Sequence, residues 1–317
     1  MESLPARAHL APALTDARIA DWCLANLGST PRQRLFERHH LSRVIGLALV
    51  DGRRIVVKVR PDHPRLDGCY QVQRHLAATG FPCPRPLTPP VRVGALAVSA
   101  ETYVAGGRII RFSDARPELF ARALARLISS TEGLAESVDV SPSPPWVSFE
   151  SGSSRLWPQP DDVEGDLNDP RLSGWIDDVA RKARERIARH SGRRVYGHGD
   201  WYAANIPCRG DRIHTVHDWD SVVREPECVI AGVASAIFPG TGAPGEVASV
   251  AQSDAFLRAY ADERGVKRST DDMQICWAAS VWTRAFDAKK EMLRGGDILA
   301  LDRQEATERL RRAGVRF

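Results

Sequence analysis

Two short segments in the second half of the sequence contain the side chains best suited to chemistry. The first holds His198, Asp200 and Asn205, and the second holds Asp218 and Asp220 on either side of a tryptophan. A carboxylate can take the proton of a reacting hydroxyl group, and carboxylate and amide oxygens are ligands that Mg²⁺ accepts beside phosphate groups. Together these residue types indicate metal-assisted transfer of a phosphoryl group.

Short strands are needed to hold these residues near one another. One strand is predicted just before His198, and a second, Ile213–Val216, leads into Asp218. If the two belong to adjacent hairpins, Asp200, Asn205 and Asp218 meet at one edge. The alternative for the same residues is a buried polar turn whose aspartates cap loops and helices.

The rest of the chain changes character near Gly106-Gly107, a glycine pair that predicts a hinge. The elements expected before it are a helix at Thr15–Leu27 capped by Thr15 and ended by Gly28, strands at Arg43–Val50 and Arg53–Val59 joined by Asp51-Gly52, a helix at Leu66–Thr79, and strands at Val91–Val93 and Leu96–Val104. The elements expected after it are a helix from Ser113 to Ser130, a long loop at 138–170, and helices at 171–190, 225–237, 247–264, 270–293 and 300–313. This order predicts an α+β protein with a β-rich lobe, a mostly helical lobe and a cleft between them.

The motifs resemble those of the aminoglycoside phosphotransferase and choline kinase group, which has a two-lobed protein-kinase-like fold. The spacing Asp-x-x-x-x-Asn from Asp200 to Asn205, followed by Asp-Trp-Asp from Asp218, is similar to the kinase catalytic loop and metal-binding aspartate. The resemblance implies that Asp200 is the catalytic base and that Asn205 and Asp218 bind Mg²⁺. It further implies that His198 supports the loop and that Asp220 lies behind the metal ligands.

The resemblance also implies ATP as co-substrate and a small-molecule hydroxyl as acceptor. It assigns nucleotide binding to an N-terminal lobe at 1–104, and the catalytic loop, metal site and acceptor site to a lobe at 105–317. Lys58 stands where the family has a phosphate-binding lysine, and it is the only lysine before Lys182. By position, the Glu101 carbonyl and the Tyr103 amide would bind adenine.

Two features depart from the family pattern. The helix after Lys58 lacks the glutamate that pairs with this lysine, since Asp67 is its only acid and Gln71 and Gln73 are neutral. The segment Ser42–Leu49, expected to cradle phosphate, has a single glycine. A catalytically weak nucleotide-binding pseudokinase with a sensing role is therefore the alternative to a small-molecule kinase.

Other motifs are weaker. The run Gly240–Gly245 matches G-x-G-x-x-G by letter, but Pro244 lacks the N–H that a phosphate loop needs, so a helix–helix loop is predicted. His198, His214 and His217 do not form a hydrolase metal set, because the last two would point to opposite faces of one strand. The six cysteines form no C-x-x-C pair, which argues against a zinc site and a disulfide framework.

Composition limits the class of partner. The net charge of +4 does not by itself indicate nucleic acid, although residues 1–100 carry 14 Lys and Arg against 7 Asp and Glu. The longest apolar stretch, Val229–Phe238, is too short to cross a bilayer, and the first 20 residues do not resemble a secretory signal. These observations favour a protein that binds neither nucleic acid nor membrane. With its scattered cysteines the chain is expected in the cytoplasm, as a monomer or homodimer. An acidic group at Asp161, Asp162, Glu164 and Asp166 suits a cationic acceptor or a solvated loop equally.

Overall fold

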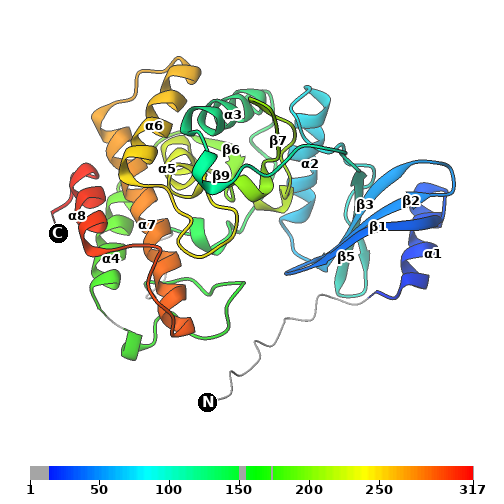
Figure 1. The fold of residues 1–317 in the computed structure, drawn as a ribbon, viewed down its shortest axis with the longest axis horizontal. Coiled ribbons are helices and arrows are strands. Elements are labelled where there is room, and N and C mark those ends of the chain that lie inside the picture. Colours follow the sequence, from blue (N-terminus) through cyan, green and yellow to red (C-terminus); the bar gives the residue numbers. More distant parts are fainter. Residues whose placement is uncertain (1–13, 150–154, 173, 317) are drawn as a thin grey trace. The chain divides into compact units, whose positions relative to one another are not determined.

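The computed structural model describes residues 14–149, 155–172 and 174–316 (Figure 1). Residues 1–13 and 150–154, on which part of the predictions for the N-terminus and the long loop rest, lie outside it. The chain forms two compact units. Unit 1 comprises the residues up to Ala105 together with Ser137–Val140, and unit 2 comprises Gly106–Glu136 and the residues from Ser141 onward.

Unit 1 is built on a five-stranded antiparallel sheet of order β1-β2-β3-β5-β4. Its strands are β1 Pro31–His39, β2 Arg43–Leu49, β3 Arg54–Pro61, β4 Val91–Val93 and β5 Leu96–Thr102. The predicted hairpin at Asp51-Gly52 is confirmed, with Gly52 in the left-handed region at φ 88°. Strand β1 was not predicted, because its polar sequence PRQRLFERH shows no apolar alternation.

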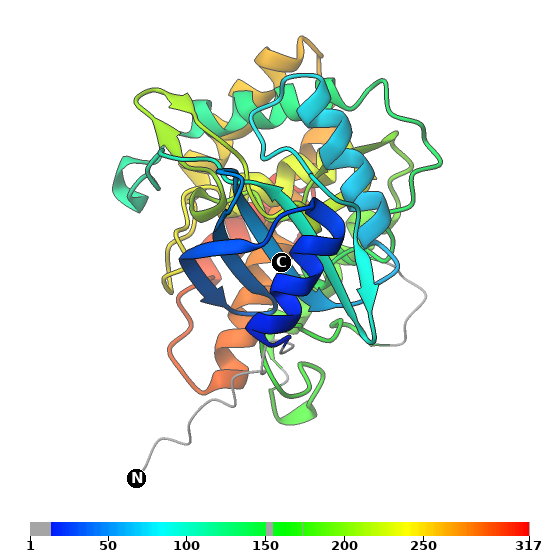
Figure 2. The ribbon, with the colours of Figure 1, turned by 90° about the vertical axis from the view of Figure 1, so that its right-hand side faces the viewer.

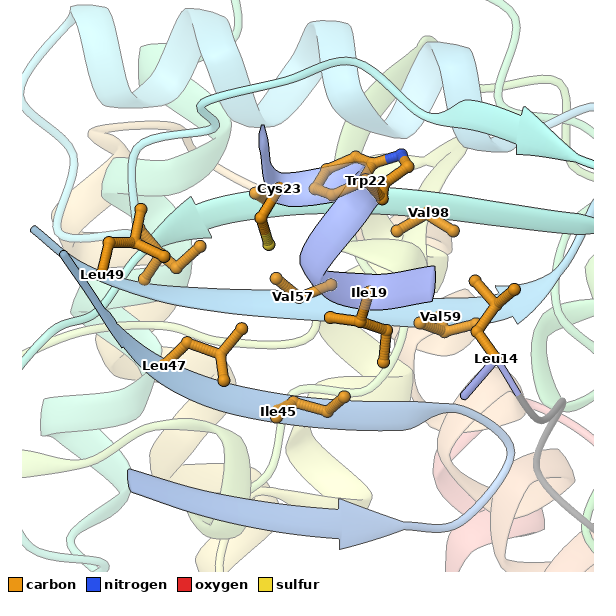
Figure 3. Packing of buried hydrophobic residues seen from close by; sticks show 12 residues of the cluster. Leu14, Ile19, Trp22, Cys23, Ile45, Leu47, Leu49, Val57, Val59 and Val98 are labelled. Carbon is orange, nitrogen blue, oxygen red and sulfur yellow. The ribbon is translucent and has the colours of Figure 1, made fainter. Parts of the chain in front are cut away.

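Helix α1, Asp16–Leu27, covers one face of this sheet (Figure 2). It begins and ends as predicted, because the Thr15 hydroxyl accepts from the Arg18 amide and Gly28 adopts a left-handed cap. Ile19, Trp22 and Cys23 point from α1 onto the sheet (Figure 3). The strand residues beneath them include Ile45, Leu47, Leu49, Val57, Val59 and Val98.

Side chains at alternate positions of β3 lie on opposite faces of the sheet. Val57 and Val59 belong to the core under α1, so Lys58 lies on the other face. Helix α2, Leu66–Ala78, completes unit 1 where the sequence predicts it.

Unit 2 is mostly helical. Its helices are α3 Pro117–Ser130, α4 Trp175–Ala188, α5 Glu227–Ile237, α6 Val250–Arg264, α7 Thr270–Arg294 and α8 Arg303–Arg312, with short 3-10 turns η1 Phe112–Asp114, η2 Pro145–Val147, η3 Pro170–Leu172, η4 Ala203–Asn205 and η5 Trp219–Ser221. Helix α5 packs against α7, which also contacts α4 and α8. The predicted start of α3 at Ser113 is wrong, because Pro117 at the first helical position begins the helix later.

Two short ladders interrupt the helices of unit 2. Strand β6, Arg194–His198, pairs with β9, Val222–Pro226, and strand β7, Cys208–Arg209, pairs with β8, Arg212–Ile213. The predicted strand over Ile213–Val216 is therefore too long, since β8 ends at Ile213. No helix of the described residues is long and apolar enough to cross a membrane.

Candidate active site

The β6–β9 ladder brings the two chemistry-bearing segments to one end. His198 pairs with Val222 at that end, and the Gly199 amide donates to the Ser221 carbonyl at 2.7 Å. Asp200 follows the last residue of β6 by two positions, and Asp218 precedes β9 across the turn η5. The sequence predicts this meeting correctly but assigns it to a different strand pair, because β9 was missed.

His198 ties the two segments together. Its ring is buried, Nε2 donates to the His217 carbonyl at 3.0 Å, and Nδ1 accepts the Asp200 amide at 3.2 Å. These two bonds define the neutral tautomer with hydrogen on Nε2. Trp219 meets the ring edge-on at a centroid distance of 5.5 Å. The histidine therefore fixes the Asp200 backbone relative to the segment that carries Asp218.

Asn205 is held against Asp200. Its side-chain Nδ2 donates to the Asp200 backbone carbonyl and to Asp200 Oδ2, each at 3.1 Å. Its backbone carbonyl accepts the His217 amide at 2.9 Å. Because the side-chain NH₂ group makes both bonds to Asp200, the side-chain oxygen Oδ1 is the atom that can bind a metal.

Burial raises the pKa of Asp200 well above its usual value, and the nearby carboxylates of Asp218 and Asp287 add to the effect. The hydrogen bond from Asn205 acts in the opposite direction. The pKa of Tyr202 is also raised, first by burial and then by Asp200 and Asp218. The site therefore concentrates negative charge, which favours a cation bound beside these groups.

Asp218 has the backbone expected of a strained functional residue. At φ 62° and ψ 56° it is the one non-glycine with positive φ in the described part of the chain. The Ser221 hydroxyl donates to its Oδ2 at 3.3 Å, and its carbonyl accepts the Ser221 amide at 3.1 Å. A carboxylate and an amide oxygen are hard oxygen donors, so Asp218 and Asn205 fit Mg²⁺ chemically.

Aromatic side chains anchor the loop that contains Asp200. Trp201 is buried and its indole nitrogen donates to the Phe120 carbonyl of α3 at 3.1 Å. The Trp146 indole nitrogen donates to the Gly199 carbonyl at 2.9 Å. A Cβ at Gly199 would meet Val223 at 3.0 Å, which explains glycine between His198 and Asp200.

Asp287 is a residue of this site that the sequence does not predict. Asp287 on α7 is close enough to raise the pKa of Asp200, and the Lys290 charge acts on Asp200 in the opposite direction. Lys290 Nζ lies 3.2 Å from Asp287 Oδ1 and 3.1 Å from Asp162 Oδ2. No motif connects α7 to residues some 90 positions earlier, so the chain pattern alone could not identify Asp287.

In unit 1, Lys58 has an acidic partner from an unexpected element. Its Nζ lies 3.4 Å from Glu101 Oε2 on β5, and both side chains are largely buried. Glu101 is diagonal to Lys58, because Lys58 pairs with Ser99 in the β3–β5 ladder. Gln73 of α2 donates to the same Glu101 oxygen at 2.9 Å. The helix thus contributes a neutral amide that orients the acid, and β5 contributes the acid itself.

The predicted adenine donor Tyr103 is engaged within the sheet. Its amide donates to the Arg54 carbonyl at 3.1 Å, and the Arg54 guanidinium lies 4.4 Å from the centre of its ring. An adenine contact at this amide requires the bond to Arg54 to break. The donor expected from the sequence is therefore occupied in this structure, and the role of the Glu101 carbonyl stays a prediction.

Comparison with known proteins places the chain in a family. Residues 34–267 match the phosphotransferase enzyme family. The chain belongs to this family. No curated protein matches the sequence significantly.

Solved structures of other proteins share the fold of this chain. An amicoumacin kinase in complex with AMP-PNP and Ca²⁺ is 13% identical, with a TM-score of 0.62 over 95% of this chain and 92% of that chain. A choline/ethanolamine kinase family protein from Mesorhizobium loti is 17% identical, with a TM-score of 0.58 over 95% and 94%. A spectinomycin phosphotransferase in complex with ADP and spectinomycin is 11% identical, with a TM-score of 0.55 over 95% and 94%. This family member therefore has the α+β protein-kinase-like fold that its motifs predict.

The G-x-G-x-x-G run of this family member is a loop between α5 and α6, as predicted. The Thr241 amide donates to the Glu246 carboxylate at 2.8 Å. In a phosphate-binding loop the Thr241 amide would donate to the ligand. Here it donates to the Glu246 carboxylate instead.

Proposed function

We propose that this protein transfers the γ-phosphoryl group of ATP to a hydroxyl group of a small molecule, with Mg²⁺ bound. The observation that supports the proposal most strongly is the cluster of Asp200, Asn205 and Asp218 on two segments joined by His198. Phosphoryl transfer depends mainly on positioning and on oxygen ligands for the metal, and these residues supply both.

Each residue has a defined part in the proposed reaction. Asp200 accepts the acceptor hydroxyl proton as that oxygen bonds to the γ-phosphorus and the bond to the β-phosphate oxygen breaks, releasing ADP. Asn205 and Asp218 hold the metal, which neutralises phosphate charge when bound. Lys58 contacts the phosphates as a compact charge, oriented by Glu101.

The pseudokinase alternative rested on the missing acid on α2. Glu101 on β5 provides an acid 3.4 Å from Lys58, which weakens the reason for proposing a pseudokinase. Thermal-shift titration with ATP, with and without Mg²⁺, followed by a turnover assay separates the two functions. Nucleotide binding without turnover on a broad acceptor panel would favour the sensor.

The names of the structural neighbours suggest the acceptor panel. Two of them are named an amicoumacin kinase and a spectinomycin phosphotransferase, and one belongs to a choline/ethanolamine kinase family. We therefore include aminoglycosides and other antibiotics, sugars and amino alcohols, and we place the reaction in the cytoplasm on a monomer or homodimer. ADP release with each class is the direct measurement, and no release with any class would contradict the kinase proposal.

The cluster of acidic residues in the long loop is only weak support for a cationic acceptor. Asp162 pairs with Lys290 and Arg294, and Asp166 pairs with Arg155. Part of this negative charge is therefore matched within the chain. We keep amine-bearing and neutral acceptors together in the screen for this reason.

A further inference from the structure

Three different metal-binding side chains meet in unit 2 at a place that the proposed reaction does not use. His190, Cys228 and Asp272 each offer one ligand atom, and these atoms all lie within 4.8 Å of one another. His190 Nε2 is 3.2 Å from Cys228 Sγ and 4.0 Å from Asp272 Oδ1. His190 lies two residues after the end of α4, Cys228 lies in the first turn of α5 and Asp272 in the first turn of α7. Among the described residues this is the one such group of His, Cys and acidic side chains.

The imidazole of His190 is already oriented as a ligand. Its Nδ1 lies 3.2 Å from Asp271 Oδ2, and Arg186 in turn binds Asp271. With its hydrogen on Nδ1, the imidazole donates to the Asp271 carboxylate. The lone pair on Nε2 then faces Cys228. A carboxylate behind the distal nitrogen is the usual second partner of a metal-bound histidine.

Asp272 is also fixed, with one oxygen still available. Its Oδ2 accepts from the Ser269 amide at 3.1 Å and from the Ser269 hydroxyl at 2.8 Å in a helix-capping box. The other oxygen, Oδ1, is the atom near His190. The cap therefore holds the carboxylate in place without using its second oxygen.

A glycine lets the helices that carry Cys228 and Asp272 approach closely. Gly232 lies one turn after Cys228, and Cys276 lies one turn after Asp272. A Cβ at Gly232 would overlap the Cys276 carbonyl oxygen. The close packing of α5 on α7 thus depends on a residue next to the cluster.

We propose that His190, Cys228 and Asp272 bind a borderline-soft divalent cation such as Zn²⁺. One nitrogen, one sulfur and one oxygen donor are a ligand set that Zn²⁺ accepts, and a water molecule fills the fourth tetrahedral position. Mg²⁺ prefers oxygen donors and is not expected here. The inference does not depend on the proposed function.

The proposed site lies at the opposite end of the β6–β9 ladder from the catalytic segments. Arg194 pairs with Pro226 at the end of the ladder near the proposed cation, and His198 pairs with Val222 at the end near the catalytic segments. A five-residue strand extends roughly 15 Å at the usual rise per residue. A cation at this end would join α4, α5 and α7 and would not touch the reacting groups.

Binding requires one proton to leave. The Cys228 thiol hydrogen, shared with His190 Nε2, is released to solvent as sulfur bonds to the metal, and no oxidation or reduction takes place.

The test is a Co²⁺ titration of the full chain, without a histidine tag, in metal-free reducing buffer. We expect a thiolate-to-cobalt absorption band that saturates at one equivalent and is bleached by Zn²⁺. Cys228→Ala should abolish the band. Cys23→Ala, which removes a buried cysteine from unit 1, should retain it, and so should Asp218→Asn, which removes a ligand of the proposed catalytic metal.

Absence of the band in the unmodified protein, or its persistence in Cys228→Ala, would overturn the proposal. Should Cys228→Ala fold poorly, Asp271→Asn keeps all three ligands and tests the same site. It should weaken Co²⁺ binding by about 10- to 100-fold, because His190 loses its charged partner. Unchanged affinity in a folded Asp271→Asn protein would contradict the oriented-histidine site.

Discussion

At the scale of single residues, Lys58 shows how a charge pair can be kept when one element lacks the acid. Glu101 stands on β5 diagonal to Lys58, and Gln73 donates to the same carboxylate oxygen that faces the lysine. The β3–β5 register sets the diagonal position of this pair. The neutral glutamine then restrains the glutamate instead of pairing with the lysine.

Glu101→Gln should weaken the action of Lys58 on the nucleotide phosphates. The substitution removes the charge but keeps an amide oxygen for Gln73, so the fold of unit 1 should persist. We expect kcat/KM for ATP to fall about tenfold, equivalent to about 1.4 kcal/mol. Glu118→Gln, on the exposed first turn of α3, is the matched control. Equal kcat/KM values for ATP in the Glu101→Gln and Glu118→Gln proteins would contradict the role of Glu101.

Asp218 combines a metal-ligand prediction with a left-handed backbone, and two substitutions separate these properties. Asn tolerates the conformation, so Asp218→Asn should fold normally but lose the Mg²⁺ dependence of nucleotide binding. Asp218→Ala should in addition lower the free energy of unfolding by about 1 kcal/mol, because alanine is strained there. Nucleotide titrations with and without Mg²⁺, together with urea denaturation, measure both effects. A normal Mg²⁺ response in Asp218→Asn would remove this residue from the metal site.

At the scale of elements, Arg43 joins α1 to the first two strands of unit 1. From β2 its guanidinium donates to Asp16 at 2.8 Å, to Glu37 on β1 at 2.6 Å and to the Leu14 carbonyl. The hydrogen bond from Arg43 is the main reason that the pKa of Glu37 is lowered. A lowered pKa means that Glu37 stabilises the fold above its ordinary titration range and loses this effect as pH falls through the folded pKa.

Glu37→Gln should therefore destabilise unit 1 in a pH-dependent way. We expect the free energy of unfolding to fall by about 1 kcal/mol at neutral pH, the upper end of the usual range for an ion pair near the surface. At acid pH, where the native Glu37 is protonated, the difference between variant and wild type should disappear. Denaturation curves at both pH values provide the measurement, and a difference independent of pH would contradict the charge-based account.

Gly232 tests the packing of α5 on α7. Alanine favours a helix by up to about 1 kcal/mol over glycine, yet its Cβ would overlap the Cys276 carbonyl. We expect Gly232→Ala to lower the free energy of unfolding by about 1–3 kcal/mol, the usual cost of overpacking. Gly296→Ala, which has open space around its Cβ, should have no such effect. A stabilised Gly232→Ala protein would show that α5 moves away from α7 without cost.

Helices with apolar periodicity and capping residues could be predicted from the sequence, and α1, α2 and α5 to α8 lie where the pattern places them. Strands β1 and β9 could not, because β1 is polar and exposed and the five residues of β9 run directly into α5. Their partners are chosen by tertiary packing rather than by local preference.

The residues of the candidate site also fall into those that the sequence predicts and those that it does not. Asp200, Asn205 and Asp218 lie within one stretch of chain, so their spacing predicts their proximity. The contributions of Glu101 and Asp287 depend on how a sheet and a distant helix pack. No local spacing contains that information.

At the scale of the molecule, the residues proposed for one reaction lie in two units. Unit 1 provides Lys58 and Glu101, and unit 2 provides Asp200, Asn205 and Asp218. Each unit has its own buried core, so each can hold its own set in place. Substitutions in unit 1 should therefore act mainly on ATP binding, and substitutions in unit 2 on the metal and the transfer step.

The central claim is that Asp200 is the base for phosphoryl transfer, and Asp200→Asn tests it most directly. With Mg²⁺, ATP and the best acceptor from the screen, product formation is measured in parallel with AMP-PNP affinity. The account predicts that kcat falls by about 10²- to 10⁴-fold, the usual contribution of a general base, while the nucleotide still binds. Turnover at the wild-type rate by a folded Asp200→Asn protein would contradict it.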